Sequence, residues 1–138
     1  AIRPLRLGRS EDVREGELHA FTGYPILNIL WLHPATHEGI VSAVAPIAFP
    51  PDLGAPAAKE TLEKLIRPFE AFWIDATAYP GNSGSPVYEV ESGRVIGVIN
   101  SVRRRPDAAS AITNPSGISY AIPVSYVRHL LKVAGVKD

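Results

Sequence analysis

The sequence predicts an all-β domain, built as an antiparallel sandwich or barrel. Short runs rich in Val, Ile, Phe and Tyr recur along the chain. Each run is bounded by Gly, Pro, Asn or Ser, which is typical of strands. The 11 Gly and 13 Pro residues are scattered without an internal period. Many short strands punctuated in this way favour one of these two architectures.

Six runs are expected to form the strands. They cover residues 16–21, 39–45, 72–74, 87–90, 95–100 and 118–122. Residues 91–94 separate the fourth run from the fifth and predict a hairpin turn, in which Gly93 supplies a positive φ.

Two segments have helical rather than strand periodicity. Residues 57–66 predict a short helix within a loop and helix insertion at 46–70, and Pro56 and Pro68 suit its two ends. Residues 124–135 predict a C-terminal helix laid against the sheet, with Gly135 just after its last turn. The apolar side of this second helix consists of Val127, Leu130, Leu131 and Ala134.

Composition indicates one globular domain. The chain has 138 residues, of which 46% are apolar and 20% charged, and this length allows one substantial core. The formal net charge is zero, so no global field attracts nucleic acid or anionic membranes. No apolar stretch reaches the ~18 residues that a membrane span needs. The chain contains no Cys and therefore no disulfides. Because the sequence begins at Ala1, we expect a processed product or a fragment.

The chemically informative stretch is residues 79–86, YPGNSGSP. A serine between glycines in a tight turn presents an exposed hydroxyl, here that of Ser83. Gly81 permits a backbone conformation that turns the Gly81 and Ser83 amide hydrogens toward one point. Two such donors would form an oxyanion hole for an acyl-transfer intermediate. Taken alone, the motif favours a polar Gly/Ser surface loop, because isolated motif matches are often false.

This stretch resembles the nucleophile loop of the chymotrypsin/trypsin superfamily, most closely the P-G-N-S-G-G-P pattern of its HtrA-type branch. Further matches follow in order from about Pro4 to Leu131, interrupted at 45–68 and 103–116. They include residues 4–10, GIVSA at 39–43, DATA at 75–78 and GISYAIP at 117–123. The resemblance implies that residues 1–138 form the second, six-stranded antiparallel barrel of a serine endopeptidase, with residues 1–15 leading into it.

The resemblance also assigns roles to individual residues. Ser83 is the expected nucleophile, and the Gly81 and Ser83 amides, in a loop shaped by Asn82, form the expected oxyanion hole. Three groups of residues are expected to bind substrate: Thr77 at the floor of the primary specificity pocket, Ser101, Val102 and Arg103 along the edge strand, and Gly117 and Ile118 on a pocket wall. A peptide would add to the sheet edge by backbone hydrogen bonds.

Two residues depart from related patterns. Asn82 replaces the Asp that pairs with a new N-terminal amine in trypsin-like zymogens, so activation of that type is not expected. Ser85 replaces a Gly usual in the family and adds a Cβ beside the nucleophile. The insertion at 46–70 is longer than expected and either gates the site or is a surface embellishment.

A catalytic base is not evident in the sequence. A serine hydroxyl needs an adjacent base, itself oriented by a third group, and in this superfamily both come from an N-terminal barrel. The four histidines match no family motif: His19 and His129 are expected at the surface, and His33 and His37 flank a Pro that disfavours a metal-binding helix. No metal or cofactor is expected, and the chain alone is predicted to have little activity.

Alternative functions follow from the same features. The barrel could be a non-catalytic peptide-binding domain, or the face that normally meets the first barrel could drive self-association. Arg103, Arg104 and Arg105 indicate a preference for acidic substrates, a phosphate-binding patch, or a solvated loop that protects a strand end, and the zero net charge favours the solvated loop. The expected partners are a peptide or protein substrate and the N-terminal barrel, without nucleic acid, in a periplasmic or secreted setting.

Overall fold

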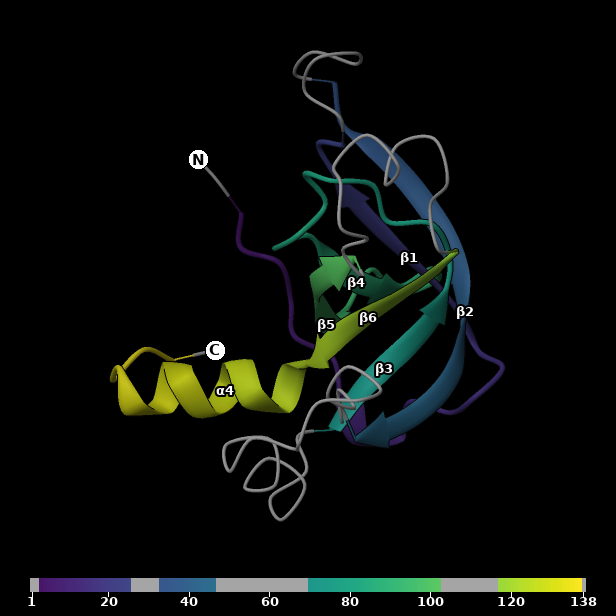
Figure 1. The fold of residues 1–138 in the computed structure, drawn as a ribbon. Coiled ribbons are helices and arrows are strands. Elements are labelled where there is room, and N and C mark those ends of the chain that lie inside the picture. The colour runs from purple at the N-terminus through teal and green to yellow at the C-terminus, as the bar shows by residue number, and fades with distance from the viewer. Residues whose placement is uncertain (1–2, 26–32, 47–69, 103–116, 138) are drawn as a thin grey trace, which may run out of the picture.

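The computed structural model describes residues 3–25, 33–46, 70–102 and 117–137. Within them, six strands close an antiparallel barrel in the order β1-β2-β3-β6-β5-β4 (Figure 1). The strands are β1 Leu18–Gly23, β2 Ala35–Pro46, β3 Glu70–Asp75, β4 Pro86–Glu89, β5 Val95–Val102 and β6 Ile118–Pro123. This confirms the predicted all-β, six-stranded barrel, and closure decides between barrel and sandwich.

Strand β2 differs most from its predicted bounds, because it begins before the expected residues 39–45. Its early part pairs with β1 in a continuous register from Leu18↔Ile40 to Gly23↔Ala35. The backbone pairing thus extends the strand through Thr36, His37 and Glu38, which are polar and carry no strand signal of their own. A bulge between Val41 and Ala43 then shifts the register in which β2 pairs with β3.

The core fills the inside of the barrel. Apolar side chains from all six strands are fully or almost fully buried there, and their burial drives closure of the sheet. They include Phe21, Val41, Phe72, Ile74, Val87, Ile96, Ile99 and Ala121.

The predicted hairpin turn between β4 and β5 is confirmed. Gly93 has φ 66°, and its amide donates to the Glu89 carbonyl at 2.9 Å. The Glu89 amide donates to the Arg94 carbonyl at 3.0 Å. This turn sets β4 against β5 and places Glu89 and Ser92 at one end of the barrel.

The C-terminal helix α4, Val124–Val133, is present and ends where predicted. Gly135 has φ 71°, its amide donates to the Lys132 carbonyl, and the Val136 amide donates to the Leu131 carbonyl. These two bonds form a Schellman motif.

The prediction that this helix lies against the sheet holds only in part, because Val127 and Leu131 are half-buried whereas Leu130 and Ala134 are exposed. Val124 is buried, whereas Leu130 is 66% and Val133 74% exposed. The helix follows β6 without a linker, so it continues away from the end of the barrel (Figure 1).

The N-terminal segment lies along β5 and leads to a 3-10 turn, η1 Ser10–Asp12. The Val95 amide donates to the Arg6 carbonyl, and the Gly8 amide donates to the Val95 carbonyl. The Ser10 hydroxyl accepts a hydrogen bond from the Ser125 amide at 3.1 Å, which ties this segment to the start of α4.

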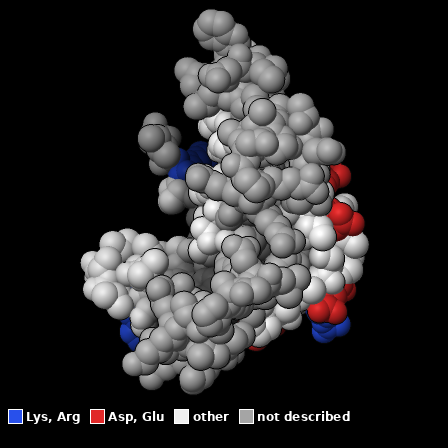
Figure 2. Space-filling model, in the orientation of Figure 1, with Lys and Arg blue, Asp and Glu red and all other residues white. Residues whose placement is uncertain are grey.

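Several predicted features lie outside the described residues: the helix at 57–66, most of the insertion at 46–70, and the loop at 103–116 with its three arginines. In the described part, no helix is long and apolar enough to cross a membrane. On the face seen in Figure 2, the described Lys and Arg residues that are visible lie in a few separate places.

Candidate active site

The loop at 76–85 joins β3 to β4 and carries Ser83 at its tip. The Asn82 amide donates to the Tyr79 carbonyl at 3.1 Å, and the Ser85 amide donates to the Asn82 carbonyl at 3.0 Å, which makes two successive tight turns. Gly81 has φ 104° and Gly84 has φ 90°. Residues with a Cβ rarely adopt such positive φ values. The two glycines therefore allow the chain to turn on both sides of Asn82-Ser83.

The same loop is fastened to strand β5. The Gly84 amide donates to the Ile99 carbonyl at 2.7 Å, and the Ile99 amide donates to the Ser85 carbonyl at 2.9 Å. Ile99 is fully buried and precedes a bulge in β5. The serine is therefore positioned by a core strand rather than by a free loop.

Exposure alternates sharply along the loop. Asn82 and Ser85 are buried, whereas Ser83 between them is exposed. Among the described residues, the Ser83 hydroxyl and the Gly81 and Ser83 amides have no hydrogen-bond partner. An exposed hydroxyl near two uncommitted amide donors provides the groups from which a nucleophile and an oxyanion hole are built.

Asn82 is fully buried and packs against the end of β1. In the described part of the chain, neither its Nδ2 nor its Oδ1 forms a hydrogen bond. A Cβ at Gly23 would lie 2.5 Å from Asn82 Oδ1 and would overlap Ser85 Oγ. Glycine at position 23 thus leaves the space that Asn82 and Ser85 occupy.

Ser119 fixes the backbone on both sides of Thr77. Its hydroxyl donates to the Ala76 carbonyl at 2.9 Å and accepts a hydrogen bond from the Ala78 amide at 3.0 Å. Ser119 is 2% exposed, so these bonds are shielded from water. Sequence reasoning did not single out Ser119, although a small polar residue within the apolar strand at 118–122 was a usable signal.

The barrel brings several predicted substrate-binding residues to the end that carries the serine loop. Asp75 pairs with Ile118, which places the half-buried Thr77 and Gly117 near the start of β6. Strand β5 ends beside them, where Ser101 pairs with Tyr120 and Val102 with Ser119. Arg103 lies outside the described residues.

His37 packs beside the start of the serine loop. Its ring stacks on Phe21 with centroids 5.0 Å apart and lies 6.0 Å from the Tyr79 ring. Its Nε2 is buried and, among the described residues, has no hydrogen-bond partner. Burial lowers the pKa of His37 below its ordinary 6.5. From the sequence, the only role considered for His37 is that of a metal ligand.

The other histidines do not approach Ser83 through any described contact. His33 and His129 are exposed, as predicted for His129. His19, predicted at the surface, is 4% exposed, so that prediction is wrong. It shares a strand face with Phe21, which points into the core. Among the described side chains, none forms a hydrogen bond with Ser83, and no group of His, Asp and Glu residues could hold a metal ion.

Comparison with known proteins gives consistent matches. A family described as "Trypsin-like peptidase domain" matches residues 1–98. The chain is 31% identical over 135 residues to "Serine protease HtrA-like" of Staphylococcus aureus, covering 96% of this chain and 15% of that protein. It is 35% identical over 127 residues to "Serine protease HTRA2, mitochondrial" of Bos taurus, covering 92% of this chain and 22% of that protein.

Solved structures support the same fold. "HtrA-type protease AlgW with decapeptide" superposes with a TM-score of 0.62 at 23% identity, covering 93% of this chain and 32% of that chain. "HtrA-type protease AlgW with tripeptide" gives the same TM-score. The chain therefore spans less than a quarter of the curated relatives and about a third of the solved neighbours.

Proposed function

Because the chain belongs to the trypsin-like peptidase family, we propose that it is the nucleophile-bearing barrel of an HtrA-like serine endopeptidase. The observation that carries this proposal is the serine loop itself. Ser83 is exposed between the buried Asn82 and Ser85, and the loop is bonded to the core strand β5 through Gly84 and Ser85. These bonds hold the Ser83 hydroxyl at a defined place on the barrel, as a nucleophile requires.

In the proposed reaction, Ser83 Oγ attacks the carbonyl carbon of a peptide bond. The hydroxyl proton passes to a general base as the C–O bond forms, and the carbonyl oxygen becomes an oxyanion. The Gly81 and Ser83 amides donate to this oxygen. The base returns the proton to the leaving amine when the C–N bond breaks, and water then hydrolyses the acyl-enzyme.

The His base and its orienting Asp belong, in this proposal, to an N-terminal barrel of the longer protein. The described residues supply no base bonded to Ser83, and the relatives are several times longer than this chain. Loss of one triad member costs roughly 10⁴ to 10⁶ in rate, so the isolated chain should be almost inactive. We also propose an extracytoplasmic setting for the whole protein.

Substrate is proposed to bind along the end of β5 and beside Thr77, Gly117 and Ile118. The barrel places these residues at the same end as Ser83. Ser119 would keep the pocket floor at Thr77 in place through its bonds to Ala76 and Ala78. The neighbours named with a decapeptide and a tripeptide support a peptide as the ligand.

Labelling with a fluorophosphonate probe tests the proposal in the full-length protein and in this chain. We expect labelling of the full-length protein, loss of more than 99% of it in Ser83→Ala, and almost none in the isolated chain. Ser42→Ala, which removes an exposed hydroxyl on β2, is the matched control and should label normally.

An unlabelled full-length protein that still binds peptides would overturn the enzyme proposal. It would favour the alternative of a non-catalytic peptide-binding domain. Concentration-dependent elution of the isolated chain in size-exclusion chromatography would instead indicate self-association through the face that meets the first barrel.

A further inference from the structure

The serine loop is bonded to the barrel at its two ends but not in its middle. Its start is bonded to Ser119 of β6, and its end to Ile99 of β5. Among the described residues, no hydrogen bond joins residues 79–83 to a residue outside the loop. The only backbone bond within that stretch runs from the Asn82 amide to the Tyr79 carbonyl at 3.1 Å. The part of the loop that presents the serine must therefore be positioned by packing.

His37 supplies such packing from strand β2. Its ring centroid lies 6.0 Å from that of Tyr79, within the range of about 4.5–7 Å over which aromatic rings attract one another. The same ring stacks on Phe21, with centroids 5.0 Å apart and planes 21° apart. Phe21 is fully buried in the core and pairs with His37 across β1 and β2. A chain of ring contacts thus runs from the core through His37 to Tyr79, whose carbonyl accepts the bond that makes the turn.

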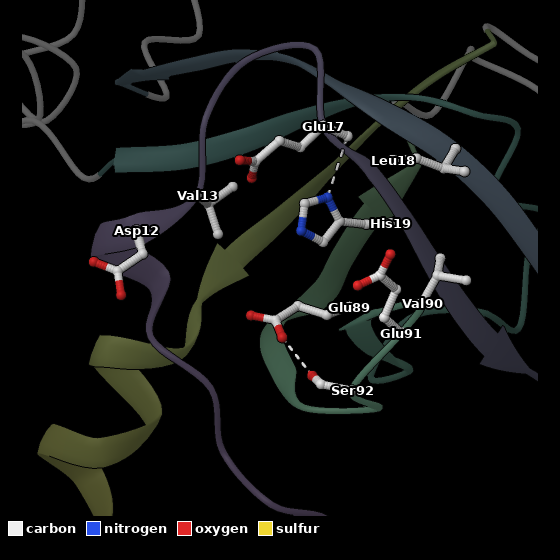
Figure 3. A pocket seen from close by; sticks show the side chains of 9 residues that line it. All are labelled: Asp12, Val13, Glu17, Leu18, His19, Glu89, Val90, Glu91 and Ser92. Atoms are coloured by element: carbon white, nitrogen blue, oxygen red, sulfur yellow. Dashed lines mark hydrogen bonds between the residues drawn. The ribbon is translucent and has the colours of Figure 1, made fainter.

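The ring nitrogens of His37 differ from those of His19, which lies near the start of β1. His19 Nδ1 is 3.2 Å from the Glu17 carbonyl oxygen (Figure 3). His37 Nε2 is buried and, among the described residues, has no hydrogen-bond partner. A protonated imidazole carries a hydrogen on both nitrogens, so protonation would bury an N–H without an acceptor. The packed position of His37 therefore suits the neutral ring.

The groups around the His37 ring do not compensate for a positive charge. Strand β1 contributes Phe21, which does not titrate, and the serine loop contributes the phenol of Tyr79. Among the described residues, no carboxylate bonds to the ring. Glu38 on β2 and Asp75 on β3 are exposed and alternate with buried residues, so they lie on the outer face of the sheet. Burial lowers the pKa of His37, in agreement with these surroundings.

We propose that His37 is a positioning residue of the serine loop, whose neutral ring, held by Phe21, keeps Tyr79 in place and with it the turn that presents Ser83. The proposal rests on the proposed function, because the position of this turn matters to catalysis only if Ser83 is the nucleophile. His37 itself touches no reacting atom. Its protonation should loosen the turn.

Amide hydrogen exchange in the 138-residue chain tests the positioning without relying on catalysis. The reporter is the Asn82 amide, and the reference is the Val41 amide, which bonds the Glu17 carbonyl away from the serine loop. At pH 7.5 we expect His37→Ala to lower protection at Asn82 at least tenfold more than at Val41. His37→Phe, which keeps an aromatic ring, should stay within about threefold of the wild type. Equal losses at the two amides, or none at Asn82, would overturn the proposal.

A pH series separates the neutral ring from its mere bulk. Between pH 7.5 and pH 5, protection at Asn82 relative to Val41 should fall in the wild type and stay level in His37→Phe, which cannot be protonated. His19→Phe removes the other histidine of the barrel interior and is the matched control, so it should follow the wild type. A wild-type ratio that does not change with pH would contradict the role of the neutral ring.

Fluorophosphonate labelling of the full-length protein connects the turn to catalysis. At pH 7.5, His37→Ala should label about tenfold more slowly than the wild type, and His37→Phe at a similar rate. Below pH 6.5 the wild type should lose rate faster than His37→Phe, a comparison in which titration of the general base cancels. Equal rates in all three proteins would overturn the proposal. A full-length protein that stays unlabelled in every form would overturn the proposed function instead, and exchange at Asn82 would still decide the positioning.

Discussion

Strand β1 connects two regions of opposite character. At its far end Gly23 packs against the serine loop, where Asn82 is buried and glycines shape the backbone. At its near end His19 opens onto a hollow lined by carboxylates. The serine end is a tight turn in which the Gly81 and Ser83 amides have no partner among the described residues. At the acidic end, Asp12, Glu17 and Glu89 are each paired with a neighbouring residue.

The two ends of the barrel differ in how much a charged side chain would cost there. The serine end buries Asn82 completely, and a formal charge at this position would be stripped of water. The acidic end keeps its carboxylates at the surface, where solvent screens them. Charge-changing substitutions should therefore have unequal costs at the two ends.

The largest expected effect is that of Asn82→Asp. A carboxylate at this fully buried position faces no described cation, so we expect the free energy of unfolding to fall by about 3 kcal/mol or more at pH 7. Urea denaturation measures it. Asn82→Leu, which has the same branching at Cγ and no charge, should cost less, and Glu91→Gln at the acidic end should change stability by less than about 0.5 kcal/mol. An Asn82→Asp variant as stable as the wild type would contradict the expectation that a charge costs more at the serine end than at the acidic end.

The serine end could be predicted from sequence because its chemistry lies in consecutive residues. The stretch 79–86 contains the proposed nucleophile Ser83 and the glycines that turn the chain, and the resemblance that assigns their roles is centred on this stretch. The strands were found for the same reason, since alternating Val, Ile and Phe mark them locally.

The acidic end could not be predicted in this way. Asp12, His19 and Glu89 meet only because β1 pairs with both β2 and β4 as the barrel closes. No local pattern reveals that closure. The packing of α4 was predicted only in part, because its apolar stripe says nothing of its direction, which is set by the direct junction with β6.

A smaller effect is expected from Ser119→Ala, which tests how firmly the serine end is held. The change leaves the buried Ala78 amide without its hydrogen-bond partner, and this costs about 1–3 kcal/mol. Ser42→Ala is the matched control, because its hydroxyl also bonds a backbone carbonyl, that of Trp73, but is exposed. Urea denaturation should show a clearly smaller loss for it. Equal losses would mean that Ser119 does not support the Thr77 segment specifically.

The smallest expected effect concerns His37, a half-buried imidazole at the serine end whose Nε2 is buried. Burial lowers its pKa below the 6.5 that it has in the unfolded chain, so the unfolded chain binds more protons as the pH falls through this range. Stability is therefore retained above pH 6.5 and declines from there toward the lowered pKa of the folded state. His37→Phe keeps an aromatic ring against Phe21 and should remove this part of the decline, whereas His129→Gln should not. Urea denaturation between pH 5 and 8 measures the difference, and parallel curves for the wild type and His37→Phe would show that the His37 ring does not couple folding to pH.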